Sequence, residues 1–315
     1  MKLFHSLLYP LLGGLFCLSC SDDEQDSGTK QPTTAGEVTF GVDLTGFSTR
    51  VTQDGSSWND GDKIGTYVLD MKTLEPVTEA ANVPYVCSEE GASVSFTSTT
   101  PLKVQNDGTP VKFVAYYPYN ADVRNFNYPV QLAAQERGST ACDLLYAATK
   151  EEYTYSPENE PHISLNFTHR LAKVILKFVN MEKEPLEVSD VRIEGMQTAA
   201  SFNIQTDVLT VDESSVATIN PYHNATTGFY EAIILPSALT DSYKVSFVLD
   251  DREKEWIFTN LDIALPQFHK GYSYTFALYI DDSGFVEMGR LENVEGGNSS
   301  APWEDGSSED GTAEG

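Results

Sequence analysis

Hydrophobic and polar side chains alternate with a period of two along much of the chain. The clearest run is residues 272–281, where every second residue from Tyr272 to Ile280 is large and apolar. Such alternation is typical of strands with one buried face and one polar face. Alternation or a short apolar run predicts further strands at Val38–Leu44, Ile64–Leu69, Val94–Phe96, Val111–Tyr117, Ile163–Phe167, Val174–Val179, Val191–Ile193, Phe229–Leu235 and Tyr243–Leu249.

Turn signals separate these runs. Asp54–Gly55, Asp60–Gly61 and Asp107–Gly108 are dipeptides that favour tight turns. Helical periodicity is scarce, and only Gln131–Gln135 is expected to form a turn or two of helix. Because many short strands joined by turns are typical of β-sandwiches, the fold class is predicted to be all-β.

The chain length of 315 residues fits two domains, or one long β domain, at about 100–200 residues per domain. The best break is Met181–Pro185, a charged stretch that ends in proline. We therefore expect an N-terminal β-sandwich over residues 37–180 and a C-terminal one over residues 181–281. Residues 282–315 form an acidic tail rich in Gly and Ser, in which Trp303 either anchors a short segment or is a lone exposed aromatic residue.

Residues 1–19 have the pattern of a signal peptide. Lys2 supplies the positive start, and the apolar core Leu7–Phe16 is too short to span a bilayer, which needs about 20 apolar residues. The core is followed by a small residue and Cys20, which resembles the lipobox of bacterial lipoproteins, where the cysteine is acylated and becomes the first mature residue. The usual pattern has Leu three places before that cysteine, whereas this chain has Cys17. An ordinary secretory signal with an incidental cysteine is the alternative.

A polar linker over residues 20–36 follows. Its acidic run Ser21–Asp26 is similar to the one that sends Bacteroidetes lipoproteins to the outer face of the outer membrane. Each CH₂ of an acyl chain buried in the bilayer contributes about 0.8 kcal/mol, so several chains on Cys20 would hold the protein firmly. The predicted location is the cell outer membrane, lipid-anchored and exposed at the surface.

The charge balance excludes several classes of partner. Asp and Glu number 47 against 20 Lys and Arg, which leaves a net charge of −27. Nucleic-acid phosphate is bound by clustered Lys and Arg, so no nucleic-acid partner is expected. Docking to an anionic membrane surface through basic side chains is disfavoured for the same reason.

The sequence contains no local signature of catalysis. The mature chain from Cys20 onward has no G-x-S-x-G elbow, no HExxH and no CxxC pair, so neither a catalytic residue nor a metal or other cofactor is predicted. With 47 acidic residues a pair of catalytic carboxylates stays open in principle, but the prediction is that the protein is not an enzyme. Cys87 and Cys142 are 55 residues apart in an exported chain, and the sequence leaves open whether they form a disulfide.

Short motifs occur in order along nearly the whole mature chain. They are Thr49–Arg50 with Trp58–Gly65, Phe113–Tyr119, Asp143–Ala147, Leu165–Lys173, Ala232–Pro236, Gly271–Tyr274 and Pro302–Gly306. Each is weak alone, but their order and spacing resemble the Mfa-like fimbrillins of Bacteroidales.

This resemblance implies two transthyretin-like β-sandwich domains in tandem and a role as stalk, tip or anchor subunit of fimbriae. It also implies donor-strand assembly, in which a protease removes the first strand and a neighbouring subunit's strand fills the gap. Arg50 is the candidate processing site, because it is the first basic residue after Lys30 and follows the strand Val38–Leu44. The alternative is that Arg50 lies on an adjoining strand and the subunit stays uncut as a lipid-held anchor or cap.

Two classes of function remain in view. The first is a structural or adhesive subunit whose partners are other fimbrial subunits, the outer membrane through its lipid, and a host protein or glycan receptor. The second is a stand-alone surface lipoprotein that binds glycans or host ligands, since exposed Tyr and Trp platforms need no sequence motif.

Three motifs have a structural interpretation beside a functional one. Asn59–Asp62 resembles part of a calcium loop, but it lacks the later carboxylates of an EF-hand, so a tight turn flanked by core residues Trp58 and Ile64 is favoured. Tyr116, Tyr117 and Tyr119 suit sugar stacking, although alternation favours core positions for some of them. His169 is interpreted as a buried structural histidine rather than a catalytic base.

Overall fold

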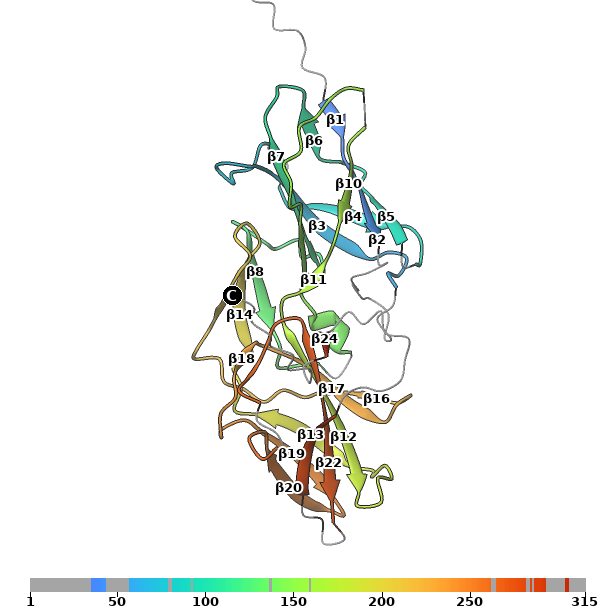
Figure 1. The fold of residues 1–315 in the computed structure, drawn as a ribbon, viewed down its shortest axis with the longest axis vertical. Coiled ribbons are helices and arrows are strands. Elements are labelled where there is room, and N and C mark those ends of the chain that lie inside the picture. Colours follow the sequence, from blue (N-terminus) through green and yellow to red (C-terminus); the bar gives the residue numbers. More distant parts are fainter. Residues whose placement is uncertain are drawn as a thin grey trace, which may run out of the picture. The chain divides into compact units, whose positions relative to one another are not determined.

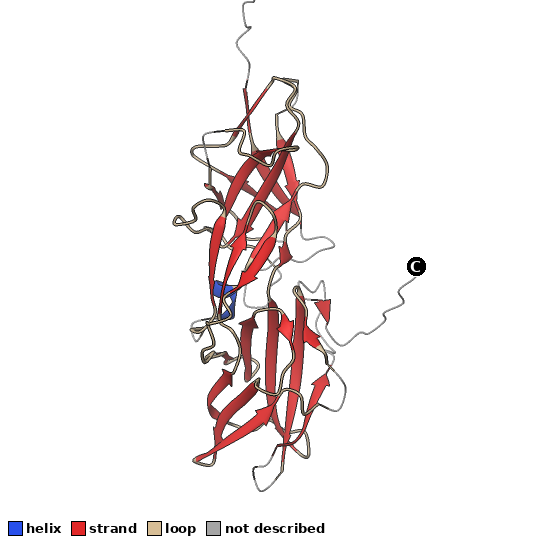
Figure 2. Cartoon of the chain, turned by 90° about the vertical axis from the view of Figure 1, so that its left-hand side faces the viewer, coloured by secondary structure: helices blue, strands red, loops and turns tan. Residues whose placement is uncertain are grey.

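The computed structural model describes residues 35–43, 57–78, 81–91, 93–135, 138–158, 160–261, 265–281, 284, 286–292 and 304–305. Figure 2 shows that these residues are almost entirely strands and connecting loops. The single helix among them is a short 3₁₀ turn, η1 (Ser139–Cys142). The predicted all-β class is therefore confirmed.

The first half is built on an eight-stranded sheet (Figure 1). Its order is β10 (His162–Leu165), β2 (Thr39–Asp43), β5 (Ser93–Thr97), β4 (Val83–Cys87), β3 (Lys63–Asp70), β7 (Val111–Tyr117), β9 (Leu145–Ala148) and β11 (Thr168–His169). A separate pair joins β1 (Ala35–Glu37) to β6 (Lys103–Gln105). We call the buried cluster on these strands the first core; its largest members are Trp58, Phe40, Tyr85, Phe96, Phe113 and Phe167.

The second half contains a larger and a smaller sheet around one core. The larger has the order β16 (Tyr222–Asn224), β17 (Phe229–Ile234), β12 (Ala172–Asn180), β22 (Tyr272–Ile280) and β23 (Val286–Glu292), with β24 (Glu304–Asp305) also paired to β22. The smaller sheet is β13 (Ser189–Glu194), β19 (Lys244–Leu249) and β20 (Arg252–Ile257). Side chains from both sheets form the second core, which includes Phe178, Phe247, Trp256, Phe258 and Phe276.

A third cluster, the seam core, draws on strands of both halves. A three-stranded sheet of β8 (Asn127–Gln131), β14 (Ala199–Asn203) and β15 (Val208–Val211) crosses from one half to the other. The small pair β18 (Ser237–Ala238) and β21 (Gln267–Phe268) completes the strands. The seam core buries Tyr67, Val114, Tyr116, Leu132, Tyr146, Phe202 and Ile233, among others.

Gln135 shows why the expected helical turn at Gln131–Gln135 is wrong. Its side-chain amide donates to the carbonyl oxygens of Leu132 (2.8 Å) and Ile233 (2.7 Å), and its Oε1 accepts the Ile233 N–H at 2.8 Å. The side chain thereby pairs with β17 as a neighbouring strand would. Extended backbone is needed to bring it there, so this contact between the halves replaces a local helical turn.

Strand pairing bears on the expected division of the chain. Strand β12 aligns in parallel with β22 from Lys173 to Asn180, so residues 172–180 belong to the larger sheet of the second half. The boundary between residues 180 and 181 and the transthyretin-like arrangement in tandem stay predictions.

Candidate assembly site

Strand β2 lies inside the eight-stranded sheet although it is among the first described residues. It pairs antiparallel with β5, with Phe40 opposite Phe96, and parallel with β10, with Phe40 opposite Ile163. A parallel pair cannot be closed by a short hairpin, and 122 residues separate Phe40 from its neighbour on β10. The first strand is therefore inserted between two partners that come from distant parts of the chain.

We call residues 35–43, which comprise β1, Val38 and β2, the first strand; its large apolar side chains belong to the first core. Val38 and Phe40 are 0% exposed and Val42 is 3% exposed. The Phe40 ring makes edge contacts with Tyr85 at 4.8 Å and Phe113 at 5.9 Å between centroids. Burying an apolar side chain of this size is worth about 1.5–3 kcal/mol, so these three contribute several kcal/mol to holding the strand.

Backbone contacts of Val38 bridge the gap between β1 and β2. The Val38 N–H donates to the Leu102 carbonyl oxygen at 2.9 Å. The Tyr85 hydroxyl donates to the Val38 carbonyl oxygen (3.0 Å) and accepts the Leu102 N–H (2.8 Å). Burial raises the pKa of Tyr85 to about 12, so this hydroxyl keeps its proton at neutral pH. Tyr85 therefore clamps the first strand to β4 and to the start of β6.

Two glycines on the first strand lie where a side chain does not fit. A Cβ on Gly41 would come within 2.7 Å of His162 Nε2, and His162 Nδ1 is 3.0 Å from the Thr39 hydroxyl. A Cβ on Gly36 would collide with the Tyr155 ring and lie 2.8 Å from Pro161 Cγ. Neighbouring side chains thus use the space that the missing Cβ atoms leave.

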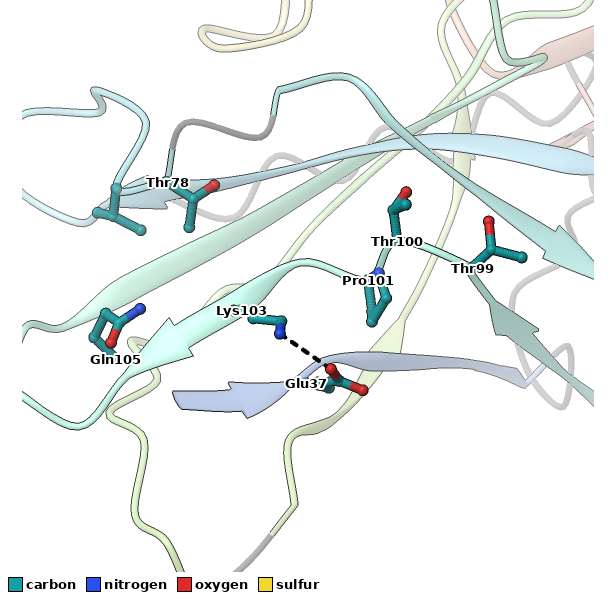
Figure 3. Close-up of a pocket in the computed structure, with 8 residues that line it drawn as sticks. Glu37, Thr78, Thr99, Thr100, Pro101, Lys103 and Gln105 are labelled. Atoms are coloured by element: carbon teal, nitrogen blue, oxygen red, sulfur yellow. Dashed lines mark ion pairs between the residues drawn. The ribbon is translucent and has the colours of Figure 1, made fainter. Parts of the chain in front are cut away.

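A hollow of about 660 Å³ adjoins β1 and β6 (Figure 3). Glu37 and Lys103 form an ion pair at 3.2 Å, but their side chains are 62% and 55% exposed. The remaining wall is made largely by Thr78, Thr99 and Pro101. An exposed ion pair contributes about 0–1 kcal/mol, so the first strand is held by its buried side chains and backbone rather than by charge.

The two site residues predicted from the sequence, Cys20 and Arg50, lie outside the described residues. Leu44, Trp303, the signal peptide and most of the acidic linker and tail do so as well. Lipidation at Cys20 and processing at Arg50 stay predictions.

The turn at Asn59–Asp62 has the geometry of a tight turn. Gly61 has a φ of +88°, the Asp62 N–H donates to the Asn59 carbonyl oxygen at 3.2 Å, and Asp62 Oδ2 accepts the Asn59 N–H at 2.6 Å. Burial raises the pKa of Asp62, although the Asn59 hydrogen bond opposes the rise. Trp58 and Ile64 are both 0% exposed, as expected for core residues that flank the turn.

Two tyrosines at the end of β7 lie in the core, and a third just after the strand lies partly at the surface. Tyr116 is 0% exposed and donates to Asn82 Oδ1 at 2.6 Å, while Tyr117 is 9% exposed with its ring edge-on to Trp58 at 5.3 Å. Burial raises the pKa of both hydroxyls. Tyr119 is half-buried and keeps part of its ring at the surface. The predicted mixture of core and rim positions is confirmed.

His169 is a buried histidine with a carboxylate partner. It is 2% exposed, and its Nδ1 lies 2.8 Å from the carboxylate of Asp143, which is 4% exposed. The side chain sits on β11 below the surface. This position supports the structural interpretation.

Cys87 and Cys142 are free thiols in the structure. Cys87 is buried in the first core, where its Sγ lies 2.9 Å from the Glu89 carbonyl oxygen, whereas Cys142 packs against the seam core. Burial raises the pKa of both thiols. Within the described ranges, no group of three or more His, Cys, Asp or Glu residues is placed to hold a metal ion.

Comparison with known proteins identifies the family. A family model described as fimbrillin-like matches residues 49–303, which is most of the chain. The chain belongs to the fimbrillin-like family. Membership makes it a fimbrial-type protein of the cell surface, and the family is one of fimbrial proteins rather than of enzymes.

Solved structures of similar fold come from Bacteroides. This fimbrillin-like chain is 23% identical to a candidate cell adhesion protein of Bacteroides uniformis, with a TM-score of 0.65 over 83% of this chain and 97% of that one. Candidate cell adhesion proteins of Bacteroides ovatus (14% identity, TM-score 0.61, 83% and 97% covered) and Bacteroides fragilis (15%, 0.53, 84% and 99%) are also similar. At these identities the likeness shows the fold alone. No curated protein matches the chain.

No helix among the described residues is long and apolar enough to cross a membrane.

Proposed function

We propose that this protein is a lipid-anchored subunit of surface fimbriae whose first strand is exchanged during assembly. The observation that carries the proposal is the position of β2, an early strand that lies inside the first sheet between β10 and β5 with its apolar side chains buried. Its described contacts to the first core are non-covalent, and its C-terminal end at Asp43 precedes Arg50 by seven residues.

Cleavage after Arg50 would separate residues 20–50 from the rest of the protein. The vacated groove would expose the edges of β5 and β10 together with the part of the first core that Val38, Phe40 and Val42 cover. Extended segments bind to exposed sheet edges through main-chain hydrogen bonds, with pockets for alternate side chains. A strand from a neighbouring subunit is the replacement, which makes other fimbrial subunits the principal partners.

An Arg-specific protease tests this directly. Lipid-free protein from residue 21 to the C-terminus should be cut at Arg50 and then form a ladder of multimers, while the Arg50→Gln variant stays uncut and monomeric. Resistance at Arg50 in a folded protein, or cutting without any multimer, would leave the subunit as an anchor, a cap or a stand-alone surface module.

Acylation at Cys20 is the second part of the proposal. Mass spectrometry of the mature protein from cells should find a lipid-modified Cys20 at the N-terminus. A Cys20→Ala protein should be released from the membrane or accumulate as the precursor. Unchanged membrane retention and mobility of that variant would contradict the lipid anchor.

A further inference from the structure

We propose that a hollow beside the turn at Arg124–Asn127 binds an acidic sugar, with Tyr119 and Phe126 against the sugar ring and Arg124 on its carboxylate. The hollow has a volume of about 500 Å³ and is lined entirely by described residues, including Tyr67 and Asn82. This goes beyond the function proposed above by naming a ligand class, and it does not depend on strand exchange.

Aromatic side chains form one wall of the hollow. Tyr67 on β3 is 3% exposed and supports the Phe126 ring, with centroids 4.7 Å apart and the planes tilted by 42°. Phe126 and Tyr119 are half-buried, so each presents part of its ring to solvent. Binding sites for small molecules are commonly lined by aromatic surface with a few converging polar groups, and this wall supplies the aromatic part.

The backbone at Phe126 is held in an unfavourable conformation. The Asn127 N–H donates to the Arg124 carbonyl oxygen at 3.0 Å, which closes a two-residue turn. Its central residues Asn125 and Phe126 have φ values of +51° and +62°. Asn tolerates this region, and the second position of such a turn favours Gly. A side chain there costs about 1–2 kcal/mol, so the large aromatic residue is present despite the turn's own preference.

A residue held in an unfavourable backbone conformation supports a functional inference when its side chain faces a site. The Ile204 N–H donates to the Phe126 carbonyl oxygen at 2.9 Å, which helps to hold the turn. The strained turn therefore fixes the Phe126 ring at the rim of the hollow.

Arg124 supplies the charge that selects an acidic ligand. One of its terminal nitrogens donates to the carbonyl oxygens of Ala121 (2.6 Å) and Val123 (2.9 Å), which orients the guanidinium at the rim. None of the ion pairs found among the described residues involves Arg124, whereas Arg170 pairs with Asp207 and Arg192 with three carboxylates. A guanidinium has five N–H donors in a planar fork, so donors remain for a carboxylate.

The positive charge of Arg124 also affects Tyr67, which lines the hollow. Burial raises the pKa of the Tyr67 hydroxyl to about 12, and Arg124 opposes part of that rise. Asn82 is fixed beside it, because its Nδ2 donates to the Asn120 carbonyl oxygen at 2.9 Å while its Oδ1 accepts from Tyr116. The net charge of −27 repels anions at a distance, but salt at physiological strength screens beyond about 8 Å, so the local charge decides close contact.

The test uses two disaccharides that differ only in one group: one carries a glucuronic acid residue and the other the neutral glucose residue. Titration of each into the whole mature protein, followed by NMR line broadening of the sugar and by calorimetry, measures affinity. We expect the acidic disaccharide to bind at least about tenfold more tightly, the difference that one charge-assisted contact supplies. Arg124→Gln should remove that preference, and Arg252→Gln, an exposed arginine on β20, should leave it intact.

Phe126 is tested by two variants with opposite expectations. Phe126→Gly relieves the backbone strain and should keep the fold while binding is lost. Phe126→Tyr keeps the ring and should bind as the wild-type protein does. Equal affinity for both disaccharides, binding that survives both Arg124→Gln and Phe126→Gly, or no binding of the acidic disaccharide by the folded protein would each overturn the proposal. Arg124→Gln should still form multimers after cleavage at Arg50, which separates this result from the test of strand exchange.

Discussion

The first and second cores are packed alike but differ in where along the chain their interior strands come from. Both are filled by aromatic rings in edge-to-face contact, such as Phe40 with Tyr85 at 4.8 Å and Phe268 with Tyr274 at 5.0 Å. In the first core a strand from the beginning of the chain lies inside the sheet, whereas β12 and β22 in the second are interior segments. Packing alone therefore does not separate the strand that we propose is exchanged from those that stay in place. The two regions differ in where along the chain the strand lies.

The polar contacts of the two regions differ in the same way. Lys173 on β12 and Glu231 on β17 form an ion pair at 2.7 Å with both side chains only 10% exposed, and Asn224 donates to Glu231 at 2.9 Å. The charged contact of the first strand, Glu37 with Lys103, is at the surface. We interpret the buried pair as a device that fixes one partner and one register, while the first strand makes contacts that another strand of suitable shape can reproduce.

The largest effects should come from truncating one central aromatic residue in each core. Phe40→Ala and Phe276→Ala each remove a ring that is 0% exposed and should each lower the free energy of unfolding by about 3–5 kcal/mol. Urea unfolding measures both losses. A peptide with the sequence of residues 35–43 should restore stability to Phe40→Ala only, because the proposed exchange requires the first groove to accept a separate strand. Restoration of Phe276→Ala as well, or of neither variant, would remove the distinction between the cores.

Lys173→Ala should cost about 3–5 kcal/mol, because it leaves Glu231 buried without its ion partner. The double variant Lys173→Met with Glu231→Gln should lose much less, since no uncompensated charge remains. Chemical denaturation of both proteins compares them. A single variant no less stable than the double variant would show that the pair does not act as a buried charge pair.

Tyr85→Phe should lower stability by about 1–3 kcal/mol at neutral pH, because the Val38 carbonyl and the Leu102 N–H both lose their partner. The wild-type contribution of Tyr85 has a definite pH dependence: its folded pKa of about 12 exceeds the ordinary 10.0, so the contribution is complete below pH 10 and lost as pH rises towards 12. Melting curves between pH 7 and 12 should show a smaller alkaline loss in the variant. Tyr155→Phe, at a half-buried ring, is the matched control.

The smallest effect is expected for Glu37→Gln, which should change stability by about 0–1 kcal/mol because the ion pair with Lys103 is exposed. Added salt should abolish even that difference. A loss comparable to that of Lys173→Ala would mean that charge, rather than burial, holds the first strand, and the contrast between the two regions would fail.

Alternating strands of the fold could be predicted from the sequence, and irregular ones could not. The predicted strands at Val111–Tyr117 and Tyr272–Ile280 match β7 and β22 at both ends, because one face of each is continuously apolar. Strand β20 (Arg252–Ile257) was not predicted, since its exposed positions carry charges and only Trp256 is buried. Strand β8 contains Pro129, which weakens any strand pattern.

Of the candidate site, only the features that depend on the sequence pattern within one strand could be predicted. Alternation indicated that Val38, Phe40 and Val42 are buried, and they are. The Tyr85 clamp joins residues 47 apart, and the residues of the parallel partner β10 lie 123 positions further along the chain than those they face on β2. No local pattern encodes contacts at such separations, because they arise only when the sheet is assembled. The strained turn at Phe126 was missed for another reason: its sequence lacks the Gly that normally signals a turn of this kind.

Under the proposed strand exchange, the missing Cβ atoms of Gly36 and Gly41 would let the first groove choose between incoming strands. Any replacement must bring apolar side chains where Val38, Phe40 and Val42 lie, yet offer almost nothing where Tyr155 and His162 crowd the backbone. An incoming strand must therefore have two small residues five positions apart, aligned with three apolar residues at the positions of Val38, Phe40 and Val42. Few segments meet this requirement. In a growing filament, this requirement would act as proofreading, because subunits with a mismatched strand would bind poorly and dissociate. The spacing of small and apolar residues along the strand would then determine which subunit follows which.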